Sequence, residues 1–205
     1  MASRPMALEG VELGLADRSF SPRQEEVLDT LERIFFSEGL DVTVGELAER
    51  AKCSRRTLYD LAPTKEALFF LVFDRMRRRL SRAGRRAAAK ASDPEHQIEA
   101  FVAAGLEVFQ PASPAFVAAI ESFPPARLLF DFHLSQTREF LVEKIELGIA
   151  EGRFRPLHPE LVAEALMAAV RRVIDPEVLE TNGVGATEAL DELFGLVLHG
   201  LLAPK

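Results

Sequence analysis

Cysteine, tyrosine and tryptophan are almost absent from this chain of 205 residues, which has one cysteine, one tyrosine and no tryptophan. With a single thiol, Cys53, no disulfide can form within the chain, and the composition fits a reducing compartment. The longest apolar run, residues 67–73, is far shorter than the roughly 20 residues that span a bilayer. No secretory signal is visible near the N-terminus. These absences predict a soluble, cytoplasmic protein with no membrane partner.

Sequence motifs of catalysis are missing as well. The chain has no HExxH, P-loop, GxGxxG or GxSxG sequence. The four histidines, His96, His133, His158 and His199, have no ligand spacing to a carboxylate or to Cys53. A helical enzyme would need an acid–base pair, which we do not find in the sequence. We therefore expect a protein that is not an enzyme and that has no metal and no cofactor.

The distribution of charge matters more than its total. The formal net charge is −7, which by itself argues against a nucleic-acid partner. However, residues 50–90 hold 13 of the 25 basic and 3 of the 32 acidic residues, a net charge of +10, and the rest of the chain carries −17. A basic segment on an acidic body is typical of DNA binding, because local charge sets the phosphate contacts. For residues 75–90 alone, a solvated charged helix is the alternative.

Residues 42–68 give the strongest local pattern in the chain. Thr43 with Glu46 three residues later is a capping box, and Ser54 is a favourable N-cap. Two short helices are therefore predicted, separated by a turn at residues 52–53. This is the plan of a helix-turn-helix, whose second helix enters the major groove of DNA with its N-terminal residues at the base edges.

Candidate DNA contacts follow from that plan. Arginine can bind guanine O6 and N7 in a bidentate manner, aspartate can accept from cytosine N4, and nearby hydroxyl or ammonium groups can reach phosphate oxygens. The predicted DNA-binding residues are Thr43, Lys52, Ser54, Arg55, Arg56, Thr57, Tyr59, Asp60 and Lys65. We expect Arg55 and Arg56 to read bases and Lys65 to contact phosphate. Cys53 fits the turn as a small buried residue, and a redox-sensing thiol is the alternative.

The same stretch resembles the DNA-binding domain of the TetR family of transcriptional regulators. The resemblance covers residues 23–70, about a quarter of the chain. One departure is Ala62, which stands where family members usually place Phe, so we expect Phe70 or Leu71 to fill the small core. The matching elements are Phe35, Phe36 and Gly39 at the end of a helix, then Thr43 before Glu46-Leu47-Ala48, then Ala51, Ser54, Thr57-Leu58-Tyr59 and Lys65-Glu66-Ala67-Leu68.

The rest of the chain lacks the alternation of strands and favours an all-α fold. Cap residues followed by proline or by good helix formers start most of the segments. We expect a flexible N-terminal arm over residues 1–20, a helix-turn-helix domain over 21–68 and a helical regulatory and dimerisation domain over 69–205. The nine predicted helices run approximately over residues 22–39, 43–51, 54–62, 64–91, 93–110, 113–123, 126–151, 158–173 and 186–202. This resembles the TetR arrangement of three helices in the head and six in the body.

The last two predicted helices are apolar over more of their circumference than one neighbour can cover. We expect them to form a four-helix interface with a second copy of the chain. Such a homodimer would present two recognition helices to a palindromic operator in double-stranded DNA, with half-sites roughly 34–36 Å apart. A plain buried core pair is the alternative. The predicted interface residues are Leu161, Leu166, Val170, Leu190, Phe194, Val197 and Leu201.

Seven of the fifteen phenylalanines lie between residues 101 and 140, among few polar side chains. Such a region is a usual small-molecule site, with plain core filling as the alternative. The predicted pocket residues are Phe101, Phe109, Phe116, Arg127, Phe130, His133 and Phe140. With the family resemblance, this pattern predicts a sequence-specific transcriptional repressor released by an unknown small-molecule effector. The alternative is an all-helical small-molecule-binding or interaction protein whose head no longer reads DNA.

Overall fold

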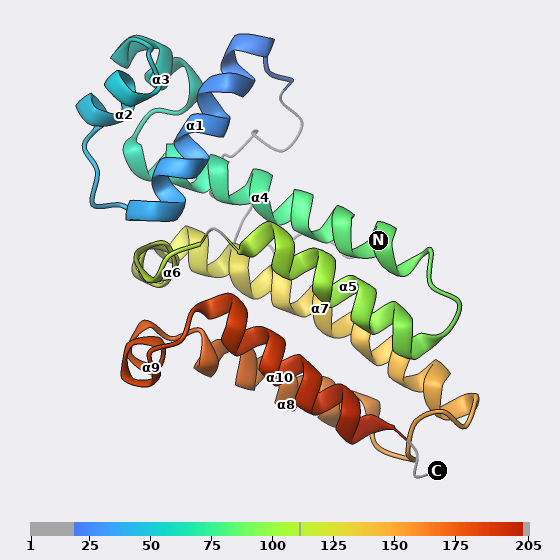
Figure 1. The fold of residues 1–205 in the computed structure, drawn as a ribbon. Coiled ribbons are helices and arrows are strands. Elements are labelled where there is room, and N and C mark those ends of the chain that lie inside the picture. Colours follow the sequence, from blue (N-terminus) through green and yellow to red (C-terminus); the bar gives the residue numbers. More distant parts are fainter. Residues whose placement is uncertain (1–18, 111, 203–205) are drawn as a thin grey trace. The chain divides into compact units, whose positions relative to one another are not determined.

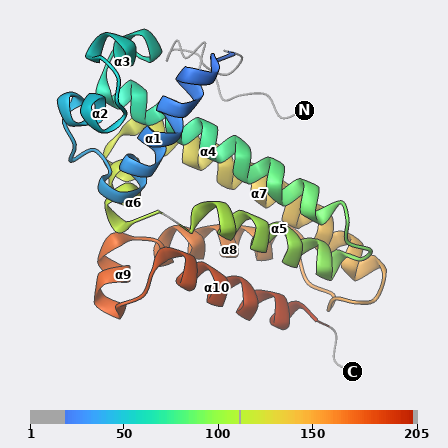
Figure 2. The ribbon, with the colours of Figure 1, turned by 45° about the horizontal axis from the view of Figure 1, so that its top comes forward.

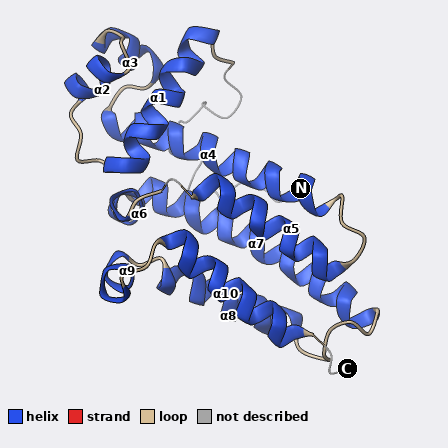
Figure 3. Cartoon of the chain, in the orientation of Figure 1, coloured by secondary structure: helices blue, strands red, loops and turns tan. Residues whose placement is uncertain are grey.

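The fold comes from a computed structural model, and the structure describes residues 19–110 and 112–202. All regular elements in these ranges are helices, and the one β feature there is an isolated bridge between Phe154 and Leu202 (Figures 1 and 3). The all-α prediction is confirmed. The predicted arm lies outside the described residues, apart from its last two positions. The helices are α1 (Pro22–Glu38), α2 (Val44–Arg50), α3 (Arg55–Leu61), α4 (Lys65–Ala88), α5 (Pro94–Phe109), α6 (Pro114–Ser122), α7 (Pro124–Ala150), α8 (Pro159–Val173), α9 (Pro176–Asn182) and α10 (Ala186–Leu201).

Local capping signals account for most helix starts. Ser21 and Thr43 each form a full capping box, in which the cap side chain and the third helical residue bond each other's backbone N–H. Asp93 and Ser113 accept hydrogen bonds from backbone N–H groups in the first turns of α5 and α6. These predicted starts are confirmed, because a cap depends only on neighbours within one helical turn.

The described chain has ten helices where the sequence predicts nine, and the additional one is α9. The sequence predicts that the preceding helix ends at residue 173, and it predicts no helix over residues 174–185. In the structure Asp175 also caps α9 by accepting from the backbone N–H of Glu177 at 3.0 Å, and Pro176 is its first helical residue. A proline in the first turn leaves no hydrogen bond unmade, so the same dipeptide can end one helix and begin another. Pro124 likewise begins α7, two residues before the predicted start.

The described helices belong to two compact units. Unit 1 consists of α1, α2, α3, the first half of α4, α6 and the start of α7, up to Arg77 and from 112 to Phe132 (Figure 2). Its core is aromatic: the ring centroid of Phe69 lies 5.4 Å from that of Phe35 and 5.5 Å from that of Phe116. Three helices that are distant in sequence, α1, α4 and α6, therefore share one set of rings.

Unit 2 consists of the remainder of α4 and α7 together with α5, α8, α9 and α10. Helix α10 packs against both α5 and α8 (Figures 1 and 2). The rings of Phe101 and Phe140 stack with centroids 4.2 Å apart. Gly84 lets α5 approach α4 closely, since a Cβ there would lie 2.8 Å from the Phe101 ring.

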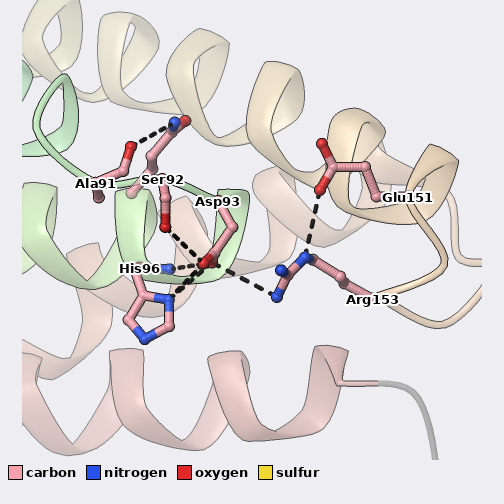
Figure 4. Close-up of polar contacts among 7 residues, drawn as sticks. Ala91, Ser92, Asp93, His96, Glu151 and Arg153 are labelled. Atoms are coloured by element: carbon pink, nitrogen blue, oxygen red, sulfur yellow. Dashed lines mark hydrogen bonds and ion pairs between the residues drawn. The ribbon is translucent and has the colours of Figure 1, made fainter.

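Polar contacts anchor the start of α5 in unit 2 (Figure 4). The Asp93 carboxylate accepts from the backbone N–H of His96 at 3.1 Å and lies 2.8 Å from His96 Nδ1. Arg153, after α7, places Nη1 3.8 Å from the same carboxylate and Nε 3.4 Å from Glu151. The hydrogen bonds from His96 lower the pKa of Asp93, and the bond to Asp93 raises the pKa of His96. The cap therefore ties α5 to the loop after α7.

Among the described residues, no single helix is long and apolar enough to cross a membrane, although α5 and α6 together pass that test as a bent pair.

Gly39, at the end of α1, is the glycine on which unit 1 depends most clearly. Its φ of 58° and ψ of −131° lie in a region that other residues rarely adopt. A Cβ at this position would lie 2.3 Å from the carbonyl oxygen of Ala115, a backbone atom that cannot rotate away. Backbone conformation and space thus both require glycine.

We expect Gly39→Ala to lower the free energy of unfolding by about 3 kcal/mol, the sum of backbone strain and overpacking. Gly152→Ala is the matched control, because Gly152 also has a positive φ, 70°, but open space where the Cβ would lie. The control should cost only about 1 kcal/mol. Urea denaturation followed by circular dichroism measures both, and equal losses would show that the contact with Ala115 has no energetic weight.

Candidate nucleic-acid interface

Helices α2 and α3 pack against each other through small apolar faces. Leu47 and Ala48 of α2 and Leu58 and Leu61 of α3 are buried in unit 1. Between the helices Lys52 has a φ of 49°, a left-handed conformation that reverses the chain, and the backbone N–H of the next residue bonds the Ala48 carbonyl at 2.9 Å. The predicted helix-turn-helix geometry is thus present, with a turn closed by backbone hydrogen bonds.

Helix α1 supports the turn through contacts that the sequence does not reveal. Arg23 Nη2 donates to the carbonyl oxygen of Lys52 at 2.7 Å, across 29 residues of sequence. Arg50 at the end of α2 pairs with Glu38 at the end of α1 at 2.7 Å. Both pairs are largely exposed, and such pairs contribute only about 0–1 kcal/mol each. They fix the orientation of the turn, while the apolar core supplies most of the stability.

The outer face of α3 is polar and exposed. Arg55, Arg56 and Asp60 are exposed, and Tyr59 has 51% of its surface accessible although it is aromatic. By contrast Leu58, one residue earlier, is completely buried. The helix therefore presents to solvent the side chains predicted to contact DNA, and none of their charged groups is buried in unit 1.

Arg55 lies against α2. A Cβ built on Gly45 would be 2.8 Å from Arg55 Nη2 and 3.7 Å from Thr43 Oγ1, so the guanidinium group rests over the first turn of α2. Glycine at position 45 leaves room for that group. A side chain that already rests on a surface loses less conformational freedom on binding than one free in solvent.

Three of the predicted DNA contacts also have structural roles. The Thr43 hydroxyl donates to Glu46 at 2.7 Å, and this bond is the main cause of the lowered pKa of Glu46. Ser54 Oγ accepts from the backbone N–H of Thr57 at 3.0 Å and caps α3. Lys65 Nζ donates to the carbonyl oxygen of Leu40 at 2.6 Å. An ammonium group has three N–H donors, so the two that do not bond Leu40 remain for the predicted phosphate contact of Lys65.

Cys53 is half-buried in the turn, and burial raises the pKa of its thiol. Because the thiolate is the reactive form, this environment does not favour a redox sensor. In the described part of the chain, no group of three or more His, Cys, Asp or Glu side chains could hold a metal ion. Ala62, Phe70 and Leu71 are all buried in unit 1.

The head of the chain matches a known family. The family profile described as "Bacterial regulatory proteins, tetR family" matches residues 27–72, which contain all of α2 and α3 with parts of α1 and α4. The profile covers the DNA-binding head and not the remainder of the chain, so this head is similar to that of the tetR family. The chain has the helix-turn-helix head and the all-α fold of a DNA-binding transcriptional regulator. No curated protein sequence matches the chain.

Solved structures show that the TetR-like fold extends over most of the chain. The ketosteroid regulator KstR2 of Mycobacterium tuberculosis is 21% identical, with a TM-score of 0.62 over 91% of this chain and 98% of that chain. A putative regulator from Saccharomonospora viridis in complex with choline is 16% identical, with a TM-score of 0.72 over 88% and 98%. The fatty acid degradation regulator FadR of Bacillus halodurans is 20% identical, with a TM-score of 0.67 over 90% and 98%.

The predicted pocket residues are divided between the two units. Phe116, Arg127 and Phe130 belong to unit 1, and Phe101, Phe109, His133 and Phe140 belong to unit 2. Phe116 is completely buried among the rings of unit 1, where it fills the core. Arg127 is exposed and lies 3.5 Å from Glu121. A cavity of about 200 Å³ borders Phe140 in unit 2 and is lined also by Arg85, Ala88, Ala89, Gln97, Glu143 and Lys144.

The predicted dimer residues fall into two classes. Leu166, Val170, Leu190 and Leu201 are buried within unit 2, so they have little surface to offer a partner. Phe194 and Val197 are partly exposed, and Leu161 has 67% of its surface accessible. The sequence pattern does not separate these classes, because apolar positions on the two sides of a helix look alike. Leu196 on α10, which the predicted interface does not include, is 74% exposed.

Proposed function

We propose that this chain is a homodimeric TetR-family repressor whose affinity for a palindromic operator changes when a small molecule binds. The observation that carries the proposal is the outward face of α3, where Arg55, Arg56 and Tyr59 are exposed in the segment that matches the family. We assign DNA binding to residues 21–68 and regulation and dimerisation to residues 69–205.

Exposed apolar and small residues on α8 and α10 support the dimer. On α8, Leu161, Ala165 and Ala168 are exposed at helical spacing, and the two helices pack side by side. On α10, Leu196 is exposed and Gly200 has open space where a Cβ would lie. Small residues allow two helices to approach closely, and leucines beside them bury well, so these faces suit a four-helix interface. The interface that we propose therefore uses this face rather than the buried positions.

The environment of Phe140 supports an effector site in unit 2. The cavity beside its ring is lined by Phe140, two alanines, Gln97 and three charged side chains, so it combines an apolar wall with polar groups that could orient a ligand. Gln97 borders it, and its Oε1 is buried without a hydrogen-bond partner among the described residues. A buried acceptor is costly unless a donor reaches it, which a hydroxyl or N–H group of a ligand could provide. The effector would act by favouring one arrangement of the two recognition helices over another.

Arg56→Ala should weaken binding to the operator by about 1–3 kcal/mol, roughly 5- to 150-fold, and should reduce the preference for operator over mixed-sequence DNA. Fluorescence anisotropy with the DNA upstream of the chain's own gene measures both quantities. Arg33→Ala is the control, because Arg33 is an exposed arginine on α1 of the same unit. Equal losses for the two variants would show that α3 does not read the bases.

Leu161→Glu combined with Leu196→Glu should convert the dimer to a monomer at micromolar concentration, because two charges per protomer would be buried in the interface. Light scattering after size-exclusion chromatography gives the mass. Leu147→Glu is the control, since Leu147 on α7 is 40% exposed and lies outside the proposed interface. A wild-type chain that is already monomeric would contradict the proposal.

An effector should raise the melting temperature of the protein and change operator affinity about 5- to 150-fold. A screen of small metabolites by thermal shift identifies binders, and anisotropy then measures the effect of each on DNA binding. Gln97→Leu should weaken binding of ligands that carry a donor, because its acceptor is removed. Binders that raise the melting temperature of the Gln97→Leu variant as much as that of wild type would place the site elsewhere.

A further inference from the structure

The second half of α4 concentrates positive charge on one helix face. Between Asp74 and Asp93 the sequence has eight basic residues and no acidic residue. Arg82, Arg85 and Arg86 are all exposed, and their spacing of three and four residues places them on one face of α4 within unit 2. We call these three residues the arginine stripe.

The described chain does not neutralise the arginine stripe. The contact of Arg82 is within its own helix, where Nε donates to the carbonyl oxygen of Arg78 at 3.2 Å. Throughout residues 19–110 and 112–202, no carboxylate lies within ion-pair distance of the three guanidinium groups. Glu143, which borders the same small cavity as Arg85, pairs with Lys144 at 2.7 Å. Like charges three or four residues apart repel each other and destabilise a helix, so an anion bound to the arginine stripe would offset that repulsion.

The end of a helix offers a partial explanation for this charge. Arg85 and Arg86 lie in the last turn of α4, where cations interact favourably with the helix dipole. That effect falls off within the last turn, so it does not account for Arg82. It also does not explain why arginine occupies all three positions, since lysine would serve the dipole equally well. Arginine differs from lysine in binding phosphate oxygens in a bidentate manner.

The chemistry of the face favours a nucleic acid over a membrane. A helix that binds a lipid surface needs large apolar side chains beside its charges. The large apolar side chains that are exposed in the described residues lie on other elements, and none of them is on α4. Duplex DNA needs only positive charge, because binding releases the counterions condensed on its phosphates.

We propose that the arginine stripe is a second DNA-contacting surface, which binds the phosphates of a duplex without reading its sequence. It is distinct from the recognition helix, since it needs neither an operator nor an effector. Each guanidinium group can bind phosphate oxygens in a bidentate manner, so three of them on one helix face give a contact that depends on charge and not on base sequence. The surface would hold the regulator on flanking or non-operator DNA.

The test uses the full chain and a mixed-sequence 40-bp duplex without operator, so its result does not depend on the proposed repressor function. Arg82→Gln/Arg85→Gln/Arg86→Gln should weaken binding about tenfold or more at low salt and flatten the slope of log K against log salt by about two to three units. Replacing the same three residues by lysine should keep most of the slope, because the charge is kept. Fluorescence anisotropy over a range of salt concentrations measures both.

Arg138→Gln/Arg153→Gln/Arg172→Gln is the matched control. It removes the same charge from three arginines of unit 2 that already pair with carboxylates. This control should bind the duplex within about twofold of wild type, since the local charge of the stripe is unchanged. Equal losses in both triple variants, or none in the stripe variant at an unchanged melting temperature, would overturn the proposal. So would loss of binding to phosphatidylglycerol vesicles with DNA binding unchanged.

Discussion

The packing of aromatic rings around Phe69 is the constraint on which unit 1 depends. Phe69 is completely buried and contacts rings from α1, α4 and α6, the last through Phe116. Phe36 reaches the same cluster, with its centroid 4.6 Å from that of Phe116. Each buried ring removes a large apolar area from water, and the tilted arrangements add favourable ring contacts. Removal of one ring would leave a cavity shared by three helices.

The helix-turn-helix depends on this core because its own helices are too short to be stable alone. α2 and α3 have seven residues each, and isolated helices shorter than about 12–15 residues are marginal in water. Their stability comes from burying Leu47, Leu58 and Leu61 against the rest of unit 1. The hydrogen bond of Arg23 and the pair of Arg50 with Glu38 then orient the turn. The exposed arginines of α3 are therefore not needed to stabilise the helix-turn-helix.

The sequence predicts this fold well where the deciding interactions are local. Caps at Ser21, Thr43 and Ser54 involve groups within one helical turn, so their residues identify the helices directly. Asp175 with Pro176 is locally ambiguous, since the dipeptide both ends α8 and begins α9, and the prediction accounted for only one role.

Side-chain partners distant in sequence are harder to predict than helices. Phe116 was assigned to a pocket because it lies among other phenylalanines, but its neighbours in space are Phe36, Phe69 and Phe73. Lys65 was predicted to contact phosphate, and its bond to the Leu40 carbonyl spans 25 residues. In both cases the residue type does not reveal the contact that the structure shows, because that contact depends on how the helices pack. Exposure on α8 and α10 is unpredictable for the same reason.

A cluster at the edge of unit 1 bears on the proposed coupling between effector and DNA. Arg77 of α4 and Phe132 of α7 are the last residues that these helices contribute to it, and the guanidinium carbon lies 5.5 Å from the ring centroid. Arg77 also bonds Asp74 at 2.9 Å, and both charged side chains are buried. A buried pair is costly to separate, because either partner alone would be an unpaired charge. Both α4 and α7 continue into unit 2. A movement of either helix along its axis would therefore either keep the contacts among Asp74, Arg77 and Phe132 or break them. Separation of the pair would be an all-or-none change, which is the kind of change that a switch requires, whereas a gradually deformable contact would dissipate the shift.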